Sequence, residues 1–563
     1  MSFDPFALPP GLLLILAALV VAGLKGMVRK ALVLLAPLAV LALVWTLPVG
    51  ELLHVSFLGH TLAPLKVDAL GRLFATIFLL MAAGGGLFAL NQDRPAEVPA
   101  AFVYAGGAVG VALAGDLISL FVFWEIMAIA STLVLWSRDD AASRAAASRY
   151  VQVHLLGGVV LLAGIAAQVN ATGSVAFAAM KPDSFGTWAI LLGFLINAGA
   201  PPFSAWLPDA YPTASYSGTV FLSAFTTKTA VYVLIRGFPG AEILIPIGLW
   251  MVFYGIVYAL LENDMRRILA YSIINQVGFM VTGIGIGSDM ALNGAAAHAF
   301  THIIYKALLL MAAGSVLYRT GKTKCTDLGG LFQSMPLTTL CGIVGALAIS
   351  SFPWTSGFVS KSMVSQAAAD SHLAWVWFGL TAASAGVFLH AGIKFPWFVF
   401  FQKDSGLRPA DPPWNMKAAM VIFAALCIGI GVFPGALYAL LPHPVDYQPY
   451  TAAHVIEMLQ LLGFSGLAFF VLLPLMKRTL TITLDTDWLY RRLGPNVVGK
   501  LGAMLATADR AIRGQVMAIL TRVLAGIKST HGRHGLFARD LSSGAMAWTT
   551  VAVLGIFLAA FYS

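Results

Sequence analysis

The chain has 563 residues, of which 59% are hydrophobic and only 10% are charged, and its formal net charge at pH 7 is +9. Soluble domains carry about 25% charged residues, so this composition excludes an ordinary soluble globular protein and indicates a polytopic membrane protein. The excess of basic residues is interpreted as loop charge that sets membrane topology, not as a surface for nucleic acid.

Membrane-spanning helices are the first predicted elements. Such a helix needs about 20 mostly apolar residues, and about sixteen segments meet this requirement. They lie near residues 8–24, 31–50, 68–90, 98–114, 116–136, 148–170, 187–207, 218–236, 244–261, 266–286, 291–318, 336–371, 374–401, 415–441, 453–476 and 543–562.

The basic residues predict how these helices are oriented. The first apolar segment has its positive charges after it, at Lys25, Arg29 and Lys30, which favours an uncleaved helix over a signal peptide and places the N-terminus outside. With that orientation, most basic residues fall in cytoplasmic loops. We therefore expect a multi-pass protein of a bacterial cell inner (cytoplasmic) membrane.

Two of the predicted spans contain helix breakers. The seventh carries Pro201 and Pro202 within AGAPPFSAWLPDAYP, and the twelfth carries Pro353 and Gly357 within SSFPWTSGF. Unwound backbone at membrane depth is stable only inside protein or beside a water-filled cavity. The breaks lie five helices apart, which predicts two inverted five-helix repeats, helices 4–8 and 9–13, with broken helices 7 and 12.

These patterns divide the chain into six predicted parts. The segment before the last span is basic and amphipathic, which is typical of a lateral helix that lies in the membrane interface or along a partner. The parts are residues 1–97 (helices 1–3), 98–243 (first repeat), 244–414 (second repeat), 415–476 (helices 14–15), 477–542 (amphipathic lateral helix) and 543–563 (final transmembrane helix).

Five ionisable residues interrupt strongly apolar segments of the sequence. A charge at the bilayer centre costs roughly 2.5–3.5 kcal/mol on insertion scales, so such residues usually face the protein interior or a water-filled path. A series of acid, lysine and histidine side chains through an apolar protein is what a proton relay requires. The five residues are Glu125, Lys228, Lys306, Lys361 and Lys394.

One predicted helix carries three titratable residues at helical spacing. His298, His302 and Lys306 are four residues apart, so they are expected to line one face. Histidine titrates near neutral pH, and burial favours the neutral form of lysine, so both groups can gain and lose protons. Arginine stays protonated, and Arg266 is therefore expected to be structural.

Five ordered motifs carry a resemblance to a known family. They resemble the antiporter-like subunits shared by respiratory complex I, membrane-bound hydrogenases and Mrp-type sodium/proton antiporters, over about residues 65–435. The tail resembles the largest complex I member, whose lateral helix braces its neighbours, whereas DTDWLYRR is more similar to bacterial Mrp-type subunits. The motifs are FVFWEIMAIAST (121–132), AGAPPFSAWLPDAYPTASYSGTVFLSAFTTKTAVYVLIR (198–236), ENDMRRILAYSIINQVGF (262–279), HAFTHIIYKALLLMAAGSV (298–316) and SGFVSKSM (356–363).

The resemblance implies roles for individual residues. The family usually has a lysine before the helix-7 break, where this chain has Asn197, and a histidine where it has Ser204. Without that lysine, Glu125 is expected to be protonated or to pair with Lys228. Asn197 and Ser204, with Pro201 and Pro353, form a possible ion or hinge site. The implied proton relay consists of Glu125, Lys228, His298, His302, Lys306, Lys361 and Lys394.

These observations favour a proton- or Na+/H+-translocating subunit of a multisubunit membrane complex. The alternative is an energy-coupling or scaffold subunit with a partly inactive relay, in a complex I-like, hydrogenase or bicarbonate-uptake assembly. A haem-binding oxidoreductase is disfavoured, because His298 and His302 share one helix. We expect no catalytic site, cofactor, metal or nucleic acid in this chain, although it could serve a proton-translocating oxidoreductase. The expected partners are other membrane subunits, the lipid bilayer, H+ and Na+.

Overall fold

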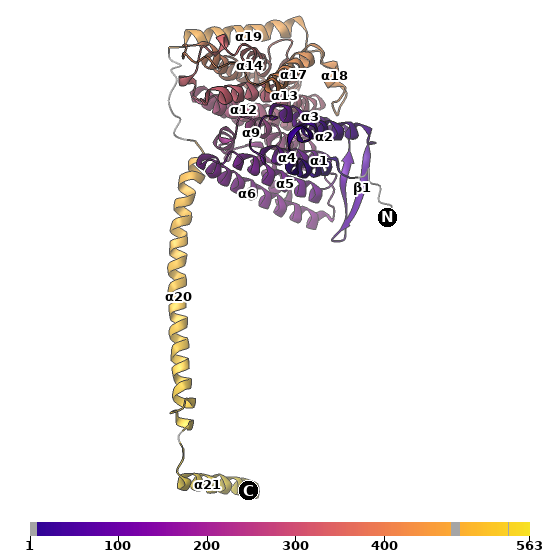
Figure 1. The fold of residues 1–563 in the computed structure, drawn as a ribbon. Coiled ribbons are helices and arrows are strands. Elements are labelled where there is room, and N and C mark those ends of the chain that lie inside the picture. The colour runs from indigo at the N-terminus through magenta and orange to yellow at the C-terminus, as the bar shows by residue number, and fades with distance from the viewer. Residues whose placement is uncertain (1–7, 475–484, 539) are drawn as a thin grey trace. The chain divides into compact units, whose positions relative to one another are not determined.

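The structure is a computed structural model that describes residues 8–474, 485–538 and 540–563. The chain divides into two compact units, Met1–Asp487 and Trp488–Ser563. The first unit is a bundle of helices joined by short connections (Figure 1). Its helices are α1 (Pro10–Gly23), α2 (Gly26–Thr46), α3 (Ala69–Phe88), α4 (Glu97–Ala112), α5 (Leu117–Trp136), α6 (Ala141–Thr172), α7 (Phe185–Ala198), α8 (Trp206–Ala210), α9 (Gly218–Leu222), α10 (Thr226–Gly237), α11 (Leu244–Leu261), α12 (Met265–Ile286), α13 (Asp289–Thr320), α14 (Pro336–Ile349), α15 (Ser356–Asp370), α16 (Ala374–Val387), α17 (Trp414–Val432), α18 (Gly435–Tyr438) and α19 (Ala452–Val471).

The helical membrane architecture predicted from the sequence is confirmed. Within the described residues, 12 helical segments are long and apolar enough to cross a membrane. Four shorter apolar helices accompany them: Pro10–Gly23, Glu97–Ala112, Phe185–Ala198 and Pro336–Ile349. The count of sixteen spans, the two inverted repeats and the six-part division stay predictions.

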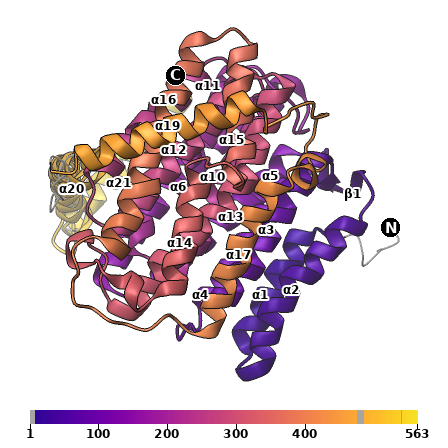
Figure 2. The same ribbon diagram turned by 90° about the horizontal axis from the view of Figure 1, so that it is seen from above.

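The centre of the bundle is formed by helices that lipid does not reach. The apolar windows of the α9–α10 segment and of α12 are 100% buried, and that of α13 is 94% buried. In the view of Figure 2, α10, α12 and α13 lie inside a ring of other helices. Polar groups on these three helices are therefore enclosed by protein, as the cost of burying charge in lipid requires.

A β-hairpin interrupts the helices and was not predicted. Strands β1 (Gly50–Phe57) and β2 (His60–Val67) pair antiparallel between α2 and α3. The turn uses Leu58 and Gly59, whose φ angles are 47° and 80°. The hairpin is fixed to the bundle because Asp116, which caps α5, also accepts a hydrogen bond of 2.9 Å from Ala63 N.

The two predicted helix breaks are present. Helix α7 ends at Ala198 and α8 begins at Trp206, and α14 ends at Ile349 before α15 begins at Ser356. Gly357 permits the second break, because a Cβ atom there would overlap the carbonyl oxygen of Ala348.

Two further irregularities were not predicted. A short interruption separates α9, which ends at Leu222, from α10, which begins at Thr226. After Val387, α16 continues as the π-helical turns η5 (Phe388–Lys394) and η6 (Trp397–Phe401). π-Helical turns often mark functional sites, and η5 ends at Lys394.

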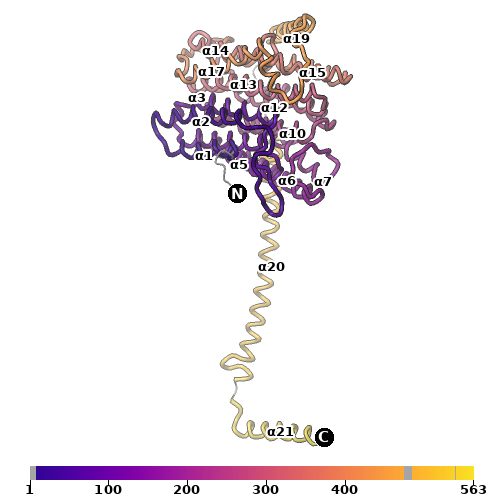
Figure 3. Tube along the Cα trace, turned by 90° about the vertical axis from the view of Figure 1, so that its right-hand side faces the viewer, coloured from indigo at the N-terminus to yellow at the C-terminus, as the bar shows by residue number. Residues whose placement is uncertain are grey.

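The second unit contains η7 (Leu489–Leu493), α20 (Gly494–His531) and α21 (Ser543–Tyr562). Figure 3 shows α20 as one continuous helix. It has 38 residues and no buried side chain, and apolar and basic residues recur along it at helical spacing. The predicted amphipathic segment 477–542 is thus helical over most of its length, but its residues 477–484 and 539 lie outside the described part of the chain.

Candidate ion-translocation site

Helix α13 carries the central titratable residues. His298, His302 and Lys306 are all fully buried. The rings of His298 and His302 have centroids 6.2 Å apart, which fits two side chains on successive turns of one face. His302 has no hydrogen-bond partner for either ring nitrogen among the described residues. Buried polar groups usually have a hydrogen-bond partner, so a water molecule is expected beside this imidazole. An imidazole in contact with water can accept and release a proton.

Neighbouring helices hold His298 in place. Its Nε2 atom lies 3.1 Å from Gln276 Oε1 on α12, and its Nδ1 atom lies 3.3 Å from Ser360 Oγ on α15. Tyr305 Oη donates a further hydrogen bond of 3.1 Å to Gln276 Oε1. Gln276, Ser360 and Tyr305 were not among the predicted site residues. Their signal was present, since each is a polar residue inside a quoted motif.

Lys306 and Lys228 are buried lysines with only neutral partners in the described residues. Lys306 Nζ donates to Ser272 Oγ at 2.9 Å. Lys228 Nζ donates to the Ser223 carbonyl oxygen at 2.7 Å and to Thr227 Oγ1 at 3.1 Å. The carbonyl of Ser223 is available because the helix is interrupted there. The unpredicted break between α9 and α10 thus creates the binding position of this amino group.

Lys361 follows the break between α14 and α15. The residue is only 2% exposed, and its Nζ atom has no hydrogen-bond partner within the described residues. The amino group lies 4.5 Å from the centroid of the Phe279 ring, a cation–π distance. Lys361 also lies one residue after Ser360, which contacts His298. The second-half residues predicted from the sequence are therefore brought together along α13 and α15.

Lys394 has a different environment. Its Nζ atom donates to the carbonyl oxygens of Ala259, Leu260 and Glu262, at 3.1, 2.5 and 2.6 Å, where α11 ends. The last carbonyl groups of a helix have no partner within the helix, so these bonds cap α11. A relay role for Lys394 stays a prediction, and its contacts favour a capping role.

His390 is a buried titratable residue that the sequence analysis did not single out. It lies in η5, and its Nδ1 atom is 2.8 Å from the Gly386 carbonyl oxygen. Its Nε2 atom has no partner among the described residues. The signal was a single histidine inside an apolar span.

The first half is arranged differently. Glu125 on α5 is half-buried, and its Oε1 atom has no hydrogen-bond partner among the described residues. No ion pair joins it to Lys228 within the described chain, so the pairing, one of the two expected states, is not observed. Gly158 on α6 makes room for the carboxylate, because a Cβ atom there would overlap Glu125 Oε1.

Asn197, at the position where the resemblance implies a lysine, pairs with a histidine. Its Oδ1 atom lies 2.8 Å from His154 Nδ1 on α6. Asn197 Nδ2, His154 Nε2 and the buried Ser204 Oγ all lack partners in the described structure. Pro201 lies in the unwound stretch after α7, and Pro353 lies in the stretch between α14 and α15. The structure therefore gathers Asn197 and Ser204 near one break, and an ion or hinge role for them stays a prediction.

Arg266 is structural, as expected. It is fully buried, and its Nη2 atom donates to the carbonyl oxygens of Ala214 and Ser215, at 2.9 and 2.8 Å, and also to Thr219 Oγ1. These contacts tie the segment after the first break to α12.

Comparison with known proteins places this arrangement in a family. The family model described as NADH:quinone oxidoreductase/Mrp antiporter, TM, matches residues 114–387. One of the Na(+)/H(+) antiporter subunits from Alkalihalophilus pseudofirmus is 30% identical over 54% of this chain and 67% of its own length. The chain belongs to the NADH:quinone oxidoreductase/Mrp antiporter family.

Other members differ in length. A probable K(+)/H(+) antiporter subunit from Rhizobium meliloti is 29% identical over 66% of this chain, but the match covers only 40% of that longer protein. A chain in the structure of the Mrp complex from Dietzia sp. DQ12-45-1b matches with a TM-score of 0.69 and 21% identity, covering 83% of this chain and 99% of that one. This similarity confirms the fold.

Some candidate residues lie inside the segment that matches the family model, and others lie outside it. Residues 114–387 include every predicted relay residue from Glu125 to Lys361. The match ends immediately before η5, which carries His390 and Lys394. The shared family segment thus contains the buried residues of α10, α13 and α15, whereas the η5 residues are argued from their contacts alone.

Proposed function

We propose that this chain is an ion-translocating, antiporter-like subunit of a multisubunit membrane complex and that it moves protons through its second half. The observation that carries the proposal is the series of buried titratable side chains on α13 and α15, together with Lys228 of α10, the last helix of the first predicted repeat, which packs against α13. In this series His302 and Lys361 have no hydrogen-bond partner among the described residues. The series comprises Lys228, His298, His302, Lys306 and Lys361.

The proposed mechanism depends on a small difference in free energy between the charged and the neutral form of each buried lysine. Burial disfavours a charged lysine, whereas a nearby negative group or a polar contact favours it. Lys228 and Lys306 have hydroxyl and carbonyl partners that accept from an ammonium group. Movement of these partners changes the balance and releases or takes up a proton. In the proposed order, the proton passes between Lys228 and Lys306 through His302.

The printed names of the relatives support a monovalent cation as the exchanged ion. We propose Na+ in exchange for H+, since the matching antiporter protein of A. pseudofirmus is named for that pair. We further propose that the chain lies in a bacterial cytoplasmic membrane with its N-terminus outside and that other membrane subunits surround it. The distribution of basic loops supports this orientation.

Sodium-dependent proton movement in membrane vesicles that contain the full complex tests the proposal. Lys361→Ala is expected to reduce the rate by more than tenfold at unchanged protein amount, because it removes a buried proton carrier. Lys322→Ala, in an exposed loop, is the matched control and should leave the rate unchanged. An unchanged rate for Lys361→Ala refutes the second-half pathway.

A partly inactive relay is the second candidate function, and the Asn197–His154 contact favours it for the first half. In this arrangement Glu125 has no lysine partner within the described residues, so its half of the chain lacks the charge pair that a relay uses. The expected result is that Glu125→Gln changes sodium-dependent proton movement less than twofold, while Lys361→Ala abolishes it. Equal losses in both variants would assign activity to both halves.

A further inference from the structure

A small polar cavity lies beside Lys361. It has a volume of about 60 Å³ and is formed by α15, α16, α19 and the loop before α19. A water molecule needs roughly 10–15 Å³ on this measure, so the cavity holds several. Two of its lining atoms, Lys361 Nζ and Ser351 Oγ, are buried and have no hydrogen-bond partner among the described residues. Such atoms require water, which indicates that the cavity is hydrated.

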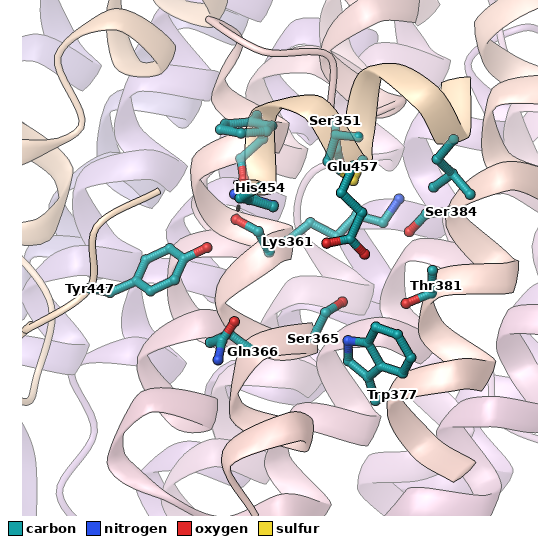
Figure 4. A pocket seen from close by; sticks show the side chains of 14 residues that line it. Ser351, Lys361, Ser365, Gln366, Trp377, Thr381, Ser384, Tyr447, His454 and Glu457 are labelled. Atoms are coloured by element: carbon teal, nitrogen blue, oxygen red, sulfur yellow. Dashed lines mark hydrogen bonds between the residues drawn. The ribbon is translucent and has the colours of Figure 1, made fainter. Parts of the chain in front are cut away.

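The cavity also contains a carboxylate. Figure 4 shows Glu457, from α19, and Lys361, from α15, extending into the same pocket, with Thr381 and Ser384 of α16 along its side. Glu457 is the one acidic residue among the described residues that line the pocket. It is also the one acidic or basic residue in the α19 sequence, apart from His454. A carboxylate in an apolar helix is costly unless polar groups face it, and here the cavity provides them.

The cavity lies toward one end of the helices that form it. Glu457 is exposed in this chain, whereas Lys361 is buried. Helix α15 ends at Asp370 and α19 begins at Ala452, and Gln366, Tyr447 and His454 line the cavity near these ends. Under the orientation proposed above, this is the outer face. The cavity therefore reaches from buried Lys361 to exposed Glu457, near the ends of α15 and α19.

We propose that this cavity is the outer port of the second-half pathway and that Glu457 is its terminal proton acceptor. This inference rests on the proposed function and adds a residue and a route to it. The Lys361 ammonium group gives one proton to a cavity water, which passes a proton to the Glu457 carboxylate. Lys361 is then a neutral amine and Glu457 a neutral acid, which releases its proton to the solvent. His454 and Tyr447 are the other titratable groups that face the route.

The hydration of the port is tested without measuring transport. Ser365 lines the cavity, and Ser315 is fully buried elsewhere. In the full chain in sealed vesicles, Ser365→Cys is expected to react with a charged, membrane-impermeant thiol reagent at least tenfold faster than Ser315→Cys. The three native cysteines are buried and provide the background rate. Equal rates for the two variants would overturn the port.

The role of Glu457 is tested by transport. Glu457→Gln keeps the shape but removes the acid, and it is expected to lower sodium-dependent proton movement about tenfold. Glu457→Asp should restore at least half of the rate, which a packing role would not do. Glu242→Gln, an exposed acid in the loop between α10 and α11, is the matched control and should leave the rate unchanged.

The outcomes separate this inference from the proposed function. If Lys361→Ala abolishes transport and Glu457→Gln does not, the second-half pathway stands and Glu457 is excluded from it. If neither variant changes transport, the pathway and the port both fail. Loss of transport in Glu457→Gln with equal loss in Glu457→Asp would indicate a structural role and would overturn the assignment.

Discussion

His154 Nδ1 lies 2.8 Å from Asn197 Oδ1, one residue before α7 ends at Ala198. Each residue is buried, and each is the other's hydrogen-bond partner. Removing either one leaves a buried polar group unsatisfied, which costs about 1–3 kcal/mol. We expect His154→Ala and Asn197→Ala each to destabilise the protein by this amount and the double variant to cost less than their sum. Thermal unfolding in detergent measures the coupling, and strictly additive effects would contradict the contact.

Gly158→Ala is predicted to be less favourable than alanine at an open helical position, because it displaces the Glu125 carboxylate. The methyl group of Gly158→Ala would overlap Glu125 Oε1, so the carboxylate or α6 must move. Replacing glycine by alanine inside a helix stabilises it by about 0.5–1 kcal/mol, and displacement of the flexible Glu125 side chain is expected to offset this gain at Gly158. Gly429→Ala on α17 is the matched control, because nothing lies within 4 Å of the added atom there. The same unfolding temperature for both variants would show that Glu125 does not occupy the space beside α6.

Arg266 is predicted to stabilise the segment between α8 and α9, which follows the first helix break. Arg266→Ala would leave the carbonyl oxygens of Ala214 and Ser215 without this donor. Because each unsatisfied buried group costs about 1–3 kcal/mol, we expect a destabilisation of about 3 kcal/mol and faster proteolysis after residue 210. Arg266→Lys should recover part of the loss, since one ammonium group reaches fewer acceptors. Proteolysis at the parent rate in Arg266→Ala would refute the role.

Lys394 is predicted to tolerate arginine. If its three bonds to the end of α11 are its function, a permanently charged guanidinium can replace the ammonium group. Lys394→Arg is then expected to retain protein amount and at least half of the proton transport, whereas Lys394→Met loses stability. Transport that disappears in Lys394→Arg while the protein stays folded would instead support the relay role implied by the family resemblance.

The sequence predicted those features that leave a local signal. Pro201 and Pro353 interrupt apolar segments, and the helices break at both. Lys228, Lys306 and Lys361 are too costly to face lipid, and all three are buried in protein. The break before Lys228 carried no such signal, because FLSAF contains neither proline nor glycine. The β-hairpin was missed although its alternating residues and Gly59 are typical of strands and a turn.

Other features depend on which helices become neighbours. Nothing near Lys394 in the sequence indicates that its amino group lies at the end of α11, more than a hundred residues earlier in the chain. Glu457 was not singled out from the sequence, because only the packing of α19 beside α16 places it at the cavity that Lys361 lines. Two states were expected for Glu125, protonated or paired with Lys228, and the pairing is not observed among the described residues. Residue types alone do not indicate whether the fold brings these two side chains together.

The central claim is that buried lysines change their protonation state, and Lys306→Arg tests it most directly. Arginine retains the positive charge and the ability to donate to Ser272 Oγ, but it does not release a proton at physiological pH. Sodium-dependent proton movement should be measured in vesicles that contain the full complex, with the amount of folded protein matched to the parent. We predict that Lys306→Arg loses at least nine-tenths of the rate. A rate equal to the parent's would contradict the account, because a fixed charge would then suffice.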